Sequence, residues 1–305
     1  MNRTPRTLSL FCLLTTLCAC AAATRPTSPD RPRPADAPKL VAVSASEERR
    51  TSALASWKTI VGEQSAAASS APELRPVTAT ISALPSTLDA PPRMPLVVIK
   101  DEKTQTEEET RESLRRFIQT AAPLLGVDPK ELSLVEVTEA RGGSRTARYR
   151  QSAFQYPLRN GYGEVSITFT QDLRVLALSS TAIPDAERLR RLLAPVAQGL
   201  PPFDVNSLAG RAITYTDRAG ARQTRTLTQA DALNARQLVV YPVLNGSDSS
   251  TLELHVAWEA AAGGPANMLY VYVDAVTGEV LGAAEGSPEV TPQTPAPTAD
   301  TRRGQ

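Results

Sequence analysis

A strict alternation of apolar and polar residues near the C-terminal end restricts the possible folds more than any other feature of the sequence. In the segment "LELHVAWE", the apolar set is Leu252, Leu254, Val256 and Trp258, and the polar set is Glu253, His255 and Glu259. Because successive side chains of a β-strand point to opposite faces, the segment predicts a strand with one face in a core and one in water. A solvated His255 follows from this interpretation, and a pH-sensitive contact with a partner is the alternative.

A second alternating segment, "MLYVYVDAVTGEVLG", predicts a strand, a tight turn and another strand. The first strand ends at Asp274, whose carboxylate can accept hydrogen bonds from N–H groups of the turn, and Gly278 supplies the positive φ that the turn needs. Glu279 is expected to begin the next strand and to point into water. Asp274 and Glu279 are therefore interpreted as turn residues, since no pocket is indicated that would join them as a catalytic pair.

Two predicted helices are each followed by alternating segments. The first helix starts at Thr104, whose spacing to Glu107 is that of a capping box, and the second starts at Asp185. The expected fold class is α+β, with two consecutive modules that each pack a helix on an antiparallel meander sheet behind a disordered N-terminal tether. The expected modules are residues 101–184 and 185–286.

Residues 1–19 are expected to be a lipoprotein signal peptide. Arginines precede an apolar run that is too short to span a bilayer, and the "LCAC" that follows resembles a bacterial lipobox in which Cys20 receives the lipid. An ordinary secretory signal with incidental cysteines is the alternative. All three cysteines of the chain lie in this region, so no internal disulfide is expected in the mature protein. The expected location is the bacterial cell envelope, and Ala21 favours the outer membrane by resemblance to the known sorting pattern.

Residues 20–100 are rich in Pro, Ala and Ser and are expected to form a flexible tether. Pro and Ser interrupt any long helix, and apolar residues are too few to offset the entropy of ordering most of the segment. Trp57 is interpreted as an exposed residue of this tether, with docking on the folded body as the alternative. Residues 287–305, rich in Pro and Thr, are expected to be a disordered tail.

The two alternating segments resemble the PepSY domain of thermolysin-like metalloprotease precursors, which typically ends in a "LAW" strand followed by "YVDAxTGEVL". Trp258, Asp274 and Gly278 carry this resemblance as structural motif residues. Upstream, "ARYRQSAFQYPLRNGYGEV" is similar to the fungalysin/thermolysin propeptide domain, and Gln151 and Pro157 keep the places of that motif.

The propeptide motif also departs from the family pattern. Ser152 replaces the usual Thr, Gln155 stands where the family has Gly, and the hairpin "LRNGYGEV" is longer than the family's. The whole resemblance covers residues 104–285, and it implies modules that assist the folding of a protease domain and inhibit it.

Residues that could carry catalysis are scarce. The chain holds one histidine, no cysteine beyond Cys20, and no His-Glu-x-x-His segment, so the usual nitrogen and sulfur ligands of a zinc site are missing. A Gly-x-Ser-x-Gly elbow and the spacing of a phosphate-binding loop are also missing from the sequence. We therefore expect that the protein is not an enzyme and has no cofactor and no metal.

The leading functional hypothesis is a lipid-anchored, propeptide-like protein that binds a thermolysin-like metalloprotease in trans and inhibits it or assists its folding. The alternative is a structural or assembly lipoprotein that uses the same fold to bind an unrelated envelope partner. A nonfunctional remnant of a protease precursor is a third interpretation. A formal net charge of +1 provides no field of one sign, so nucleic acid is not an expected partner, and membrane contact is expected only through the lipid.

Overall fold

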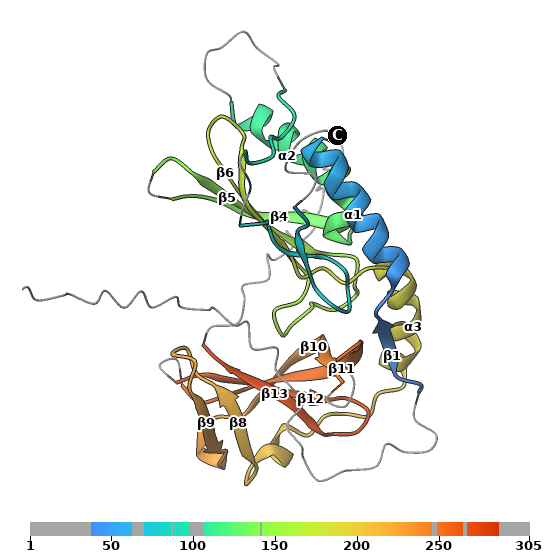
Figure 1. Ribbon diagram of the computed structural model, residues 1–305. Coiled ribbons are helices and arrows are strands. Elements are labelled where there is room, and N and C mark those ends of the chain that lie inside the picture. The colour runs from blue at the N-terminus through green and yellow to red at the C-terminus, as the bar shows by residue number, and fades with distance from the viewer. Residues whose placement is uncertain are drawn as a thin grey trace, which may run out of the picture.

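The computed structural model describes residues 38–62, 70–86, 88, 90–97, 106–140, 142–245, 249–264 and 267–286. The predicted signal peptide, Cys20 and the predicted tail lie outside these residues. The described part is α+β, as predicted, with helices packed on two main, largely antiparallel sheets (Figure 1). None of its helices is both long enough and apolar enough to cross a bilayer.

The first module is a helix packed on a four-stranded meander, β4-β5-β6-β7. Its elements are α2 (Glu107–Leu125), the short 3-10 helix η2 (Pro129–Glu131), β4 (Leu132–Glu139), β5 (Arg145–Gln151), β6 (Glu164–Phe169) and β7 (Val175–Ser180). The apolar stripe of α2 packs on the inner face of the sheet, where Phe117 shares a core with Ile167 and Phe169. Burial of this stripe, rather than helix propensity, stabilises α2 in its position.

The capping box of α2 lies two residues later than predicted. Thr106 accepts the hydrogen bond of the Glu109 N–H, and the Glu109 carboxylate accepts that of the Thr106 N–H. The segment "TQTEEE" offers the required spacing twice, so the sequence alone did not separate Thr106 from Thr104.

The second module is a helix packed on a seven-stranded sheet. Its elements are α3 (Ala186–Gln198), η3 (Val205–Leu208), β8 (Ala212–Thr216), β9 (Arg222–Thr226), η4 (Gln229–Asp231), β10 (Asn234–Leu244), β11 (Thr251–Ala262), β12 (Leu269–Asp274) and β13 (Val280–Glu285). Strands β10 to β13 form the predicted antiparallel meander. β13 then pairs in parallel with β8, which the sequence did not indicate.

Part of the predicted tether is regular structure, so the prediction is wrong for the helix and strands described before α2. β1 (Val41–Ser44) pairs with β11, and α1 (Glu47–Val61) packs on α2. A small hairpin of β2 (Glu73–Leu74) and β3 (Ile81–Ala83) lies beside β7. Trp57 is 1% exposed, and its Nε1 donates to the Ser70 carbonyl at 2.8 Å.

The composition of α1 explains why the tether prediction failed. Its buried residues are Ala53, Ser56 and Trp57, so one large side chain and two small ones suffice for a close approach to α2. Ser56 Oγ donates to the Thr120 carbonyl of α2 at 3.1 Å, which satisfies the hydroxyl in the contact. Such a helix shows almost no apolar periodicity in its sequence.

β1 and α1 together, named here the N-terminal clasp, connect the two modules. Val41 and Val43 of β1 belong to the core of the second module, whereas Ala53 and Trp57 of α1 belong to that of the first. Figure 1 shows α1 running along the upper sheet and β1 lying against the lower one. The clasp therefore bridges the modules independently of the chain that joins β7 to α3.

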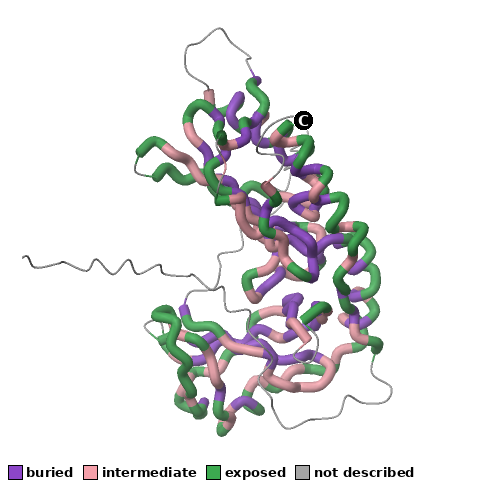
Figure 2. The backbone as a smooth tube through the Cα atoms, in the orientation of Figure 1, coloured by how far each residue is buried: buried purple, intermediate pink, exposed green. Residues whose placement is uncertain are grey.

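Both faces of β11 are buried, so the prediction of a solvated face is wrong (Figure 2). His255 is 5% and Glu259 0% exposed, whereas Trp258, assigned to the core face, is only partly buried. On this side of the sheet, Tyr241 of β10 stacks on Tyr272 of β12 with ring centroids 4.6 Å apart, and its hydroxyl lies against Gly282 of β13, so the sheet is curled. This curvature encloses side chains that would face water on a flat sheet.

Candidate functional site

The loop between β5 and β6 joins the first module to the second by pairing with the outer edge of β10. Leu158 forms a parallel bridge with Val240, the Pro157 carbonyl accepts from the Val240 N–H at 2.9 Å, and the Arg159 N–H donates to the Val240 carbonyl at 3.0 Å. Pro157, one of the predicted motif residues, therefore supplies a backbone acceptor to a strand of the other module. The longer hairpin noted in the sequence is the segment that makes this contact.

Gln151, the second upstream motif residue, holds the segment that leads into α3. Its side chain is buried; Nε2 donates to the Ile183 carbonyl at 2.9 Å, and Oε1 accepts from the Ile183 N–H at 3.0 Å. Both amide groups of the side chain are satisfied by one residue, which a shorter or charged side chain could not reproduce. Gln151 and Pro157 thus both act at the junction of the modules.

A buried ion pair crosses this junction. Arg159 Nε lies 2.7 Å from Glu259 Oε2, and the side chains are 4% and 0% exposed. Gln237 Nε2 donates to the other carboxylate oxygen at 3.1 Å, and Arg236 Nε lies 3.7 Å from it. A carboxylate buried this completely depends on its partners, because an unpaired charge in such a place is strongly destabilising.

A second buried cluster lies where β1 and β12 meet end to end on the same edge of β11. β1 pairs with the first four residues of β11, and β12 pairs from Ala257 onward. Between them, His255 Nδ1 lies 2.6 Å from Asp274 Oδ2, and His255 Nε2 lies 3.4 Å from Glu253 Oε2. The second distance is that of an ion pair and exceeds that of a normal hydrogen bond.

The environment of this cluster favours its charged form. Burial lowers the pKa of His255, but the contacts with Asp274 and Glu253 outweigh burial and leave the pKa above its ordinary value. Burial raises the pKa of Asp274, but the hydrogen bonds from His255 and from two N–H groups outweigh it and hold that pKa below its ordinary value. An imidazolium beside a carboxylate is the expected state near neutral pH.

Asp274 also caps the turn that the sequence predicts after β12. Its Oδ1 accepts from the Val276 N–H at 2.7 Å and from the Thr277 N–H at 2.9 Å. Gly278 has φ of 70°, a conformation that glycine adopts without strain. One carboxylate therefore serves both the turn and the buried histidine.

Trp258, the remaining motif residue, covers one border of the second core. Its ring stacks on Phe203 with centroids 5.7 Å apart and an interplanar angle of 11°. The contact lies against the apolar cluster that includes Leu189 and Val256. Partial exposure means that the ring contributes less burial than the sequence pattern suggested.

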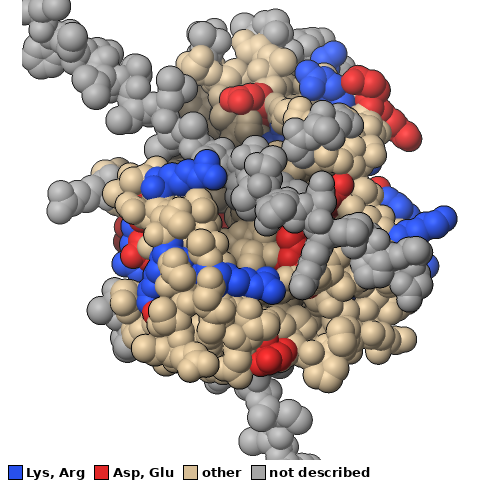
Figure 3. All heavy atoms as spheres, turned by 90° about the horizontal axis from the view of Figure 1, so that it is seen from below, with Lys and Arg blue, Asp and Glu red and all other residues tan. Residues whose placement is uncertain are grey.

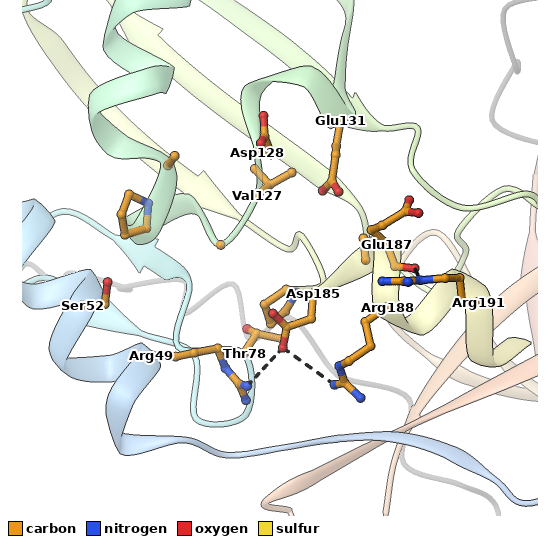
Figure 4. A pocket seen from close by; sticks show the side chains of 15 residues that line it. Arg49, Ser52, Thr78, Val127, Asp128, Glu131, Asp185, Glu187, Arg188 and Arg191 are labelled. Atoms are coloured by element: carbon orange, nitrogen blue, oxygen red, sulfur yellow. Dashed lines mark hydrogen bonds and ion pairs between the residues drawn. The ribbon is translucent and has the colours of Figure 1, made fainter.

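A pocket of about 450 Å³ lies where the N-terminal clasp, α2 and α3 meet (Figure 4). Asp185 lies 3.8 Å from Arg49 and 3.7 Å from Arg188, the two ion pairs drawn in the figure. Burial and the neighbouring carboxylates of Asp128 and Glu187 raise the pKa of Glu131 in the same pocket. Asp185 is thus already shared by two arginines, and the mixed charges of the lining favour no single class of ligand.

β4 forms an open edge of the first sheet. Its pairing within the described part of the chain is with β5 alone, and seven of its eight residues are exposed. Three of these are apolar: Leu134, Val135 and Val137 are 36%, 39% and 41% exposed. The opposite edge is covered, since the Val175 N–H donates to the Pro92 carbonyl at 2.7 Å. An exposed edge strand with apolar side chains can accept an extended segment of another protein.

Charged side chains of both signs lie on the face seen in Figure 3. Basic and acidic side chains lie among a mostly neutral surface there. Within the residues that the structure describes, no group of three or more His, Cys, Asp or Glu is arranged to hold a metal ion.

Three residues of these buried clusters were missed or misassigned by sequence reasoning. Glu259 interrupts an otherwise apolar run, "VAWEAAA", and that interruption is the one signal that could have indicated a buried charge. Arg159 lies in a loop without periodicity, and nothing in the sequence pairs it with Glu259. The alternation of its strand predicts a solvated His255, and nothing in the sequence pairs this residue with Asp274.

Comparisons with known proteins give little further information. A comparison with protein-family models finds no match, and a comparison with curated proteins finds none either. Among solved structures, the chain is similar to the "Bacillus megaterium YpeB C-terminal domain", with 8% sequence identity and a TM-score of 0.26 over 81% of this chain and 100% of that chain. A TM-score this low does not establish a common fold.

Proposed function

We propose that this chain is a lipid-anchored protein of the bacterial cell envelope that binds an extended segment of another protein and catalyses no reaction itself. The open edge of β4 is the observation that carries the binding function. Its apolar side chains are exposed beside backbone groups that pair with no other strand among the residues the structure describes, which is the surface that strand addition requires.

The pairing register indicates how an added strand would gain binding energy. Leu134 lies opposite Tyr149 and Val137 opposite Ala147, and both β5 residues belong to the buried core under α2. An added strand would therefore extend this core with alternate apolar side chains, while its backbone continued the sheet. On the other face, Glu136 pairs with Arg148 at 3.0 Å and leaves a polar rim.

The proposed partner is a thermolysin-like metalloprotease of the same envelope. The motivation is the sequence resemblance to the propeptide and PepSY domains of such enzymes, in which these modules recognise the catalytic domain. In this proposal the two modules act in trans, inhibiting the enzyme or assisting its folding, while a lipid on Cys20 holds them at the outer membrane. Since no covalent link raises the local concentration, modest affinity is expected.

The test is a titration of a metalloprotease from the same organism with the full chain purified in detergent, in which binding and peptide cleavage are followed together. The double variant Leu134→Lys with Val137→Lys places two charges on the β4 edge and should abolish binding. Leu176→Lys is the matched control, since Leu176 is an exposed apolar residue of β7 in the same sheet. Undiminished binding by the double variant would exclude β4. If the protease does not bind while another envelope protein co-purifies, the assembly alternative replaces this proposal.

A further inference from the structure

His255 is the single histidine of the chain, and it lies where the N-terminal clasp touches the second module. We propose that a proton on His255 latches β1 onto β11 and that loss of this proton releases the clasp from the second module. This inference is independent of the proposed binding at β4, which lies on the other module.

The attachment of β1 is short and begins beside the cluster. β1 has four residues, of which Val41 and Val43 are buried. Lys39, Leu40 and Val41 line a small cavity of about 10 Å³ together with His255 and Asp274. A space of this size is about that of one water molecule, so the start of β1 rests almost directly against the imidazole and its carboxylate.

Asp274 links the protonation state of His255 to the edge of β11 on which β1 pairs. The turn that Asp274 caps is itself fixed on β11, because the Ala275 N–H donates to the Val256 carbonyl at 2.9 Å. The turn and β1 thus occupy adjacent places on one edge. A neutral His255 would leave Asp274 and Glu253 as two nearby carboxylates with a weakened counter-charge in a buried place, which is unfavourable. Opening of the four-residue strand is the smallest movement that admits water to them.

The groups that face His255 set the direction of the switch. Glu253 on β11 and Asp274 at the end of β12 are its acidic neighbours, and Tyr241 lies opposite on β10. From α3, Leu193 and Val196 line the same cavity. Lys39, on the approach to β1, is exposed. Burial raises the pKa of Tyr241, so that hydroxyl remains neutral near pH 7. Because the pKa of His255 is raised, the latch is closed below the ordinary histidine pKa and opens as pH rises through the raised value.

Release would change which strand edges are available. β11 would expose the edge at Thr251–Leu254, to which a strand of another protein could then be added. α1 would stay packed on α2, because its contacts with the first module do not involve the cluster. The clasp would then remain attached to the first module and, through the ion pair of Arg49 with Asp185 at 3.8 Å, to the start of α3.

Amide hydrogen exchange of the full chain, corrected for the intrinsic effect of pH, tests the latch. The imidazole signals in the NMR spectrum need no assignment, since the chain has one histidine. Protection of the Val41 and Val43 amides should fall about tenfold as the imidazole loses its proton, the change expected when one buried charge-assisted hydrogen bond is weakened. Protection of the Phe117 amide in α2 should stay constant over the same range.

Two variants separate the latch from a general loss of stability. His255→Gln should leave the β1 amides poorly protected at every pH, and Glu253→Gln should move both the imidazole titration and the loss of protection to lower pH. Glu136→Gln, which removes an exposed carboxylate of the first module, is the control and should change neither. The proposal is overturned if β1 protection stays constant while the imidazole titrates, or if Glu253→Gln moves the imidazole titration but not the loss of protection. Should His255→Gln fail to fold, the Glu253→Gln comparison still decides.

Discussion

Arg159 and Glu259 belong to different modules and stand 100 residues apart in the sequence, yet their side chains meet at 2.7 Å with almost no exposure to solvent. Arg159 reaches this position because its loop pairs with β10, next to the strand that carries Glu259. The ion pair therefore forms only when the loop and the sheet are in their final register. Glu259 can therefore be buried together with its partner only when the two modules are correctly placed relative to each other.

Arg159→Met is expected to destabilise the protein by about 3–5 kcal/mol, because it leaves the Glu259 carboxylate buried without its main partner. Urea denaturation of the purified chain measures this. The double variant with Glu259→Met should recover most of the loss, since an apolar pair of similar volume replaces a buried ion pair well. Arg148→Met, at an exposed ion pair, is the control and should cost less than about 1 kcal/mol. Equal instability of the single and double variants would contradict this account.

Trp57→Ala should destabilise the first module by roughly 3–5 kcal/mol, because the indole is buried between α1 and the core that α2 covers. Chemical denaturation followed by circular dichroism is the measurement. Lys58→Ala, at the neighbouring exposed position, serves as the control and should change the free energy of unfolding by less than about 0.5 kcal/mol. A silent Trp57→Ala would restore the interpretation of this region as a tether.

Gly282→Ala is expected to cost about 1–3 kcal/mol, since a Cβ at this place would overlap the hydroxyl of Tyr241. The ring cannot move aside easily, because it is buried and stacked on Tyr272. Gly199→Ala is the matched control, as a Cβ there meets no atom within 4 Å. Thermal unfolding measures the stability of both variants. If Gly282→Ala loses no more stability than Gly199→Ala, the Tyr241 ring can move aside and the packing on this face of the sheet is not tight.

Asp274→Asn should make the free energy of unfolding fall less steeply as the pH is lowered into the acid range. The pKa of Asp274 is held below its ordinary value, so its contribution is present above the unfolded pKa and is lost as pH falls through the folded one. His255 acts in the opposite sense, since its raised pKa makes its contribution complete at low pH and removes it as pH rises. Urea denaturation over a series of pH values measures both limbs. If the free energy of unfolding of Asp274→Asn falls as steeply at acid pH as that of the wild type, other carboxylates cause the loss.

Cys20→Ala should abolish partitioning into detergent, because a lipid on this residue is the proposed source of membrane affinity. Cys18→Ala is the control, since Cys18 lies two residues before the modified position in the resemblance to a lipobox. Phase separation in a nonionic detergent, followed by immunoblotting, is the measurement. Detergent-phase recovery of Cys20→Ala equal to that of the wild type would contradict the lipid anchor.

The sequence predicts best those strands in which apolar and polar residues alternate clearly along the strand itself. The alternation from Leu252 to Trp258 predicts strand β11 and which of its side chains share a face. The segment from Asp274 to Gly278 predicts the turn. Burial of the polar face was not predictable, because it depends on Arg159 and on the curvature of the sheet, neither of which has a local signal. The pattern says which side chains share a face but not what lies against that face.

The N-terminal elements were missed for a different reason. α1 buries mainly small residues against α2, so its sequence lacks an apolar stripe, and the β1 segment "VAVS" is too short to be told from a linker. Their stability comes from partners that follow much later in the chain. Composition, which suggested a tether, describes the average of a segment and is insensitive to a few well-placed contacts.

The pairing of β1 with β11 also joins the two neighbouring strands of the second module that lie farthest apart in the sequence. Val41, near the start of the chain, lies opposite Leu254, whereas β10 to β13 each find a neighbour close by in sequence. During synthesis from the N-terminus, β1 therefore emerges long before its partner exists, and the entropy of closing so long a loop delays the pairing further. The earliest strand of the sheet therefore waits longest for its partner. Until β11 arrives, β1 is an unpaired strand at risk of pairing with the wrong chain.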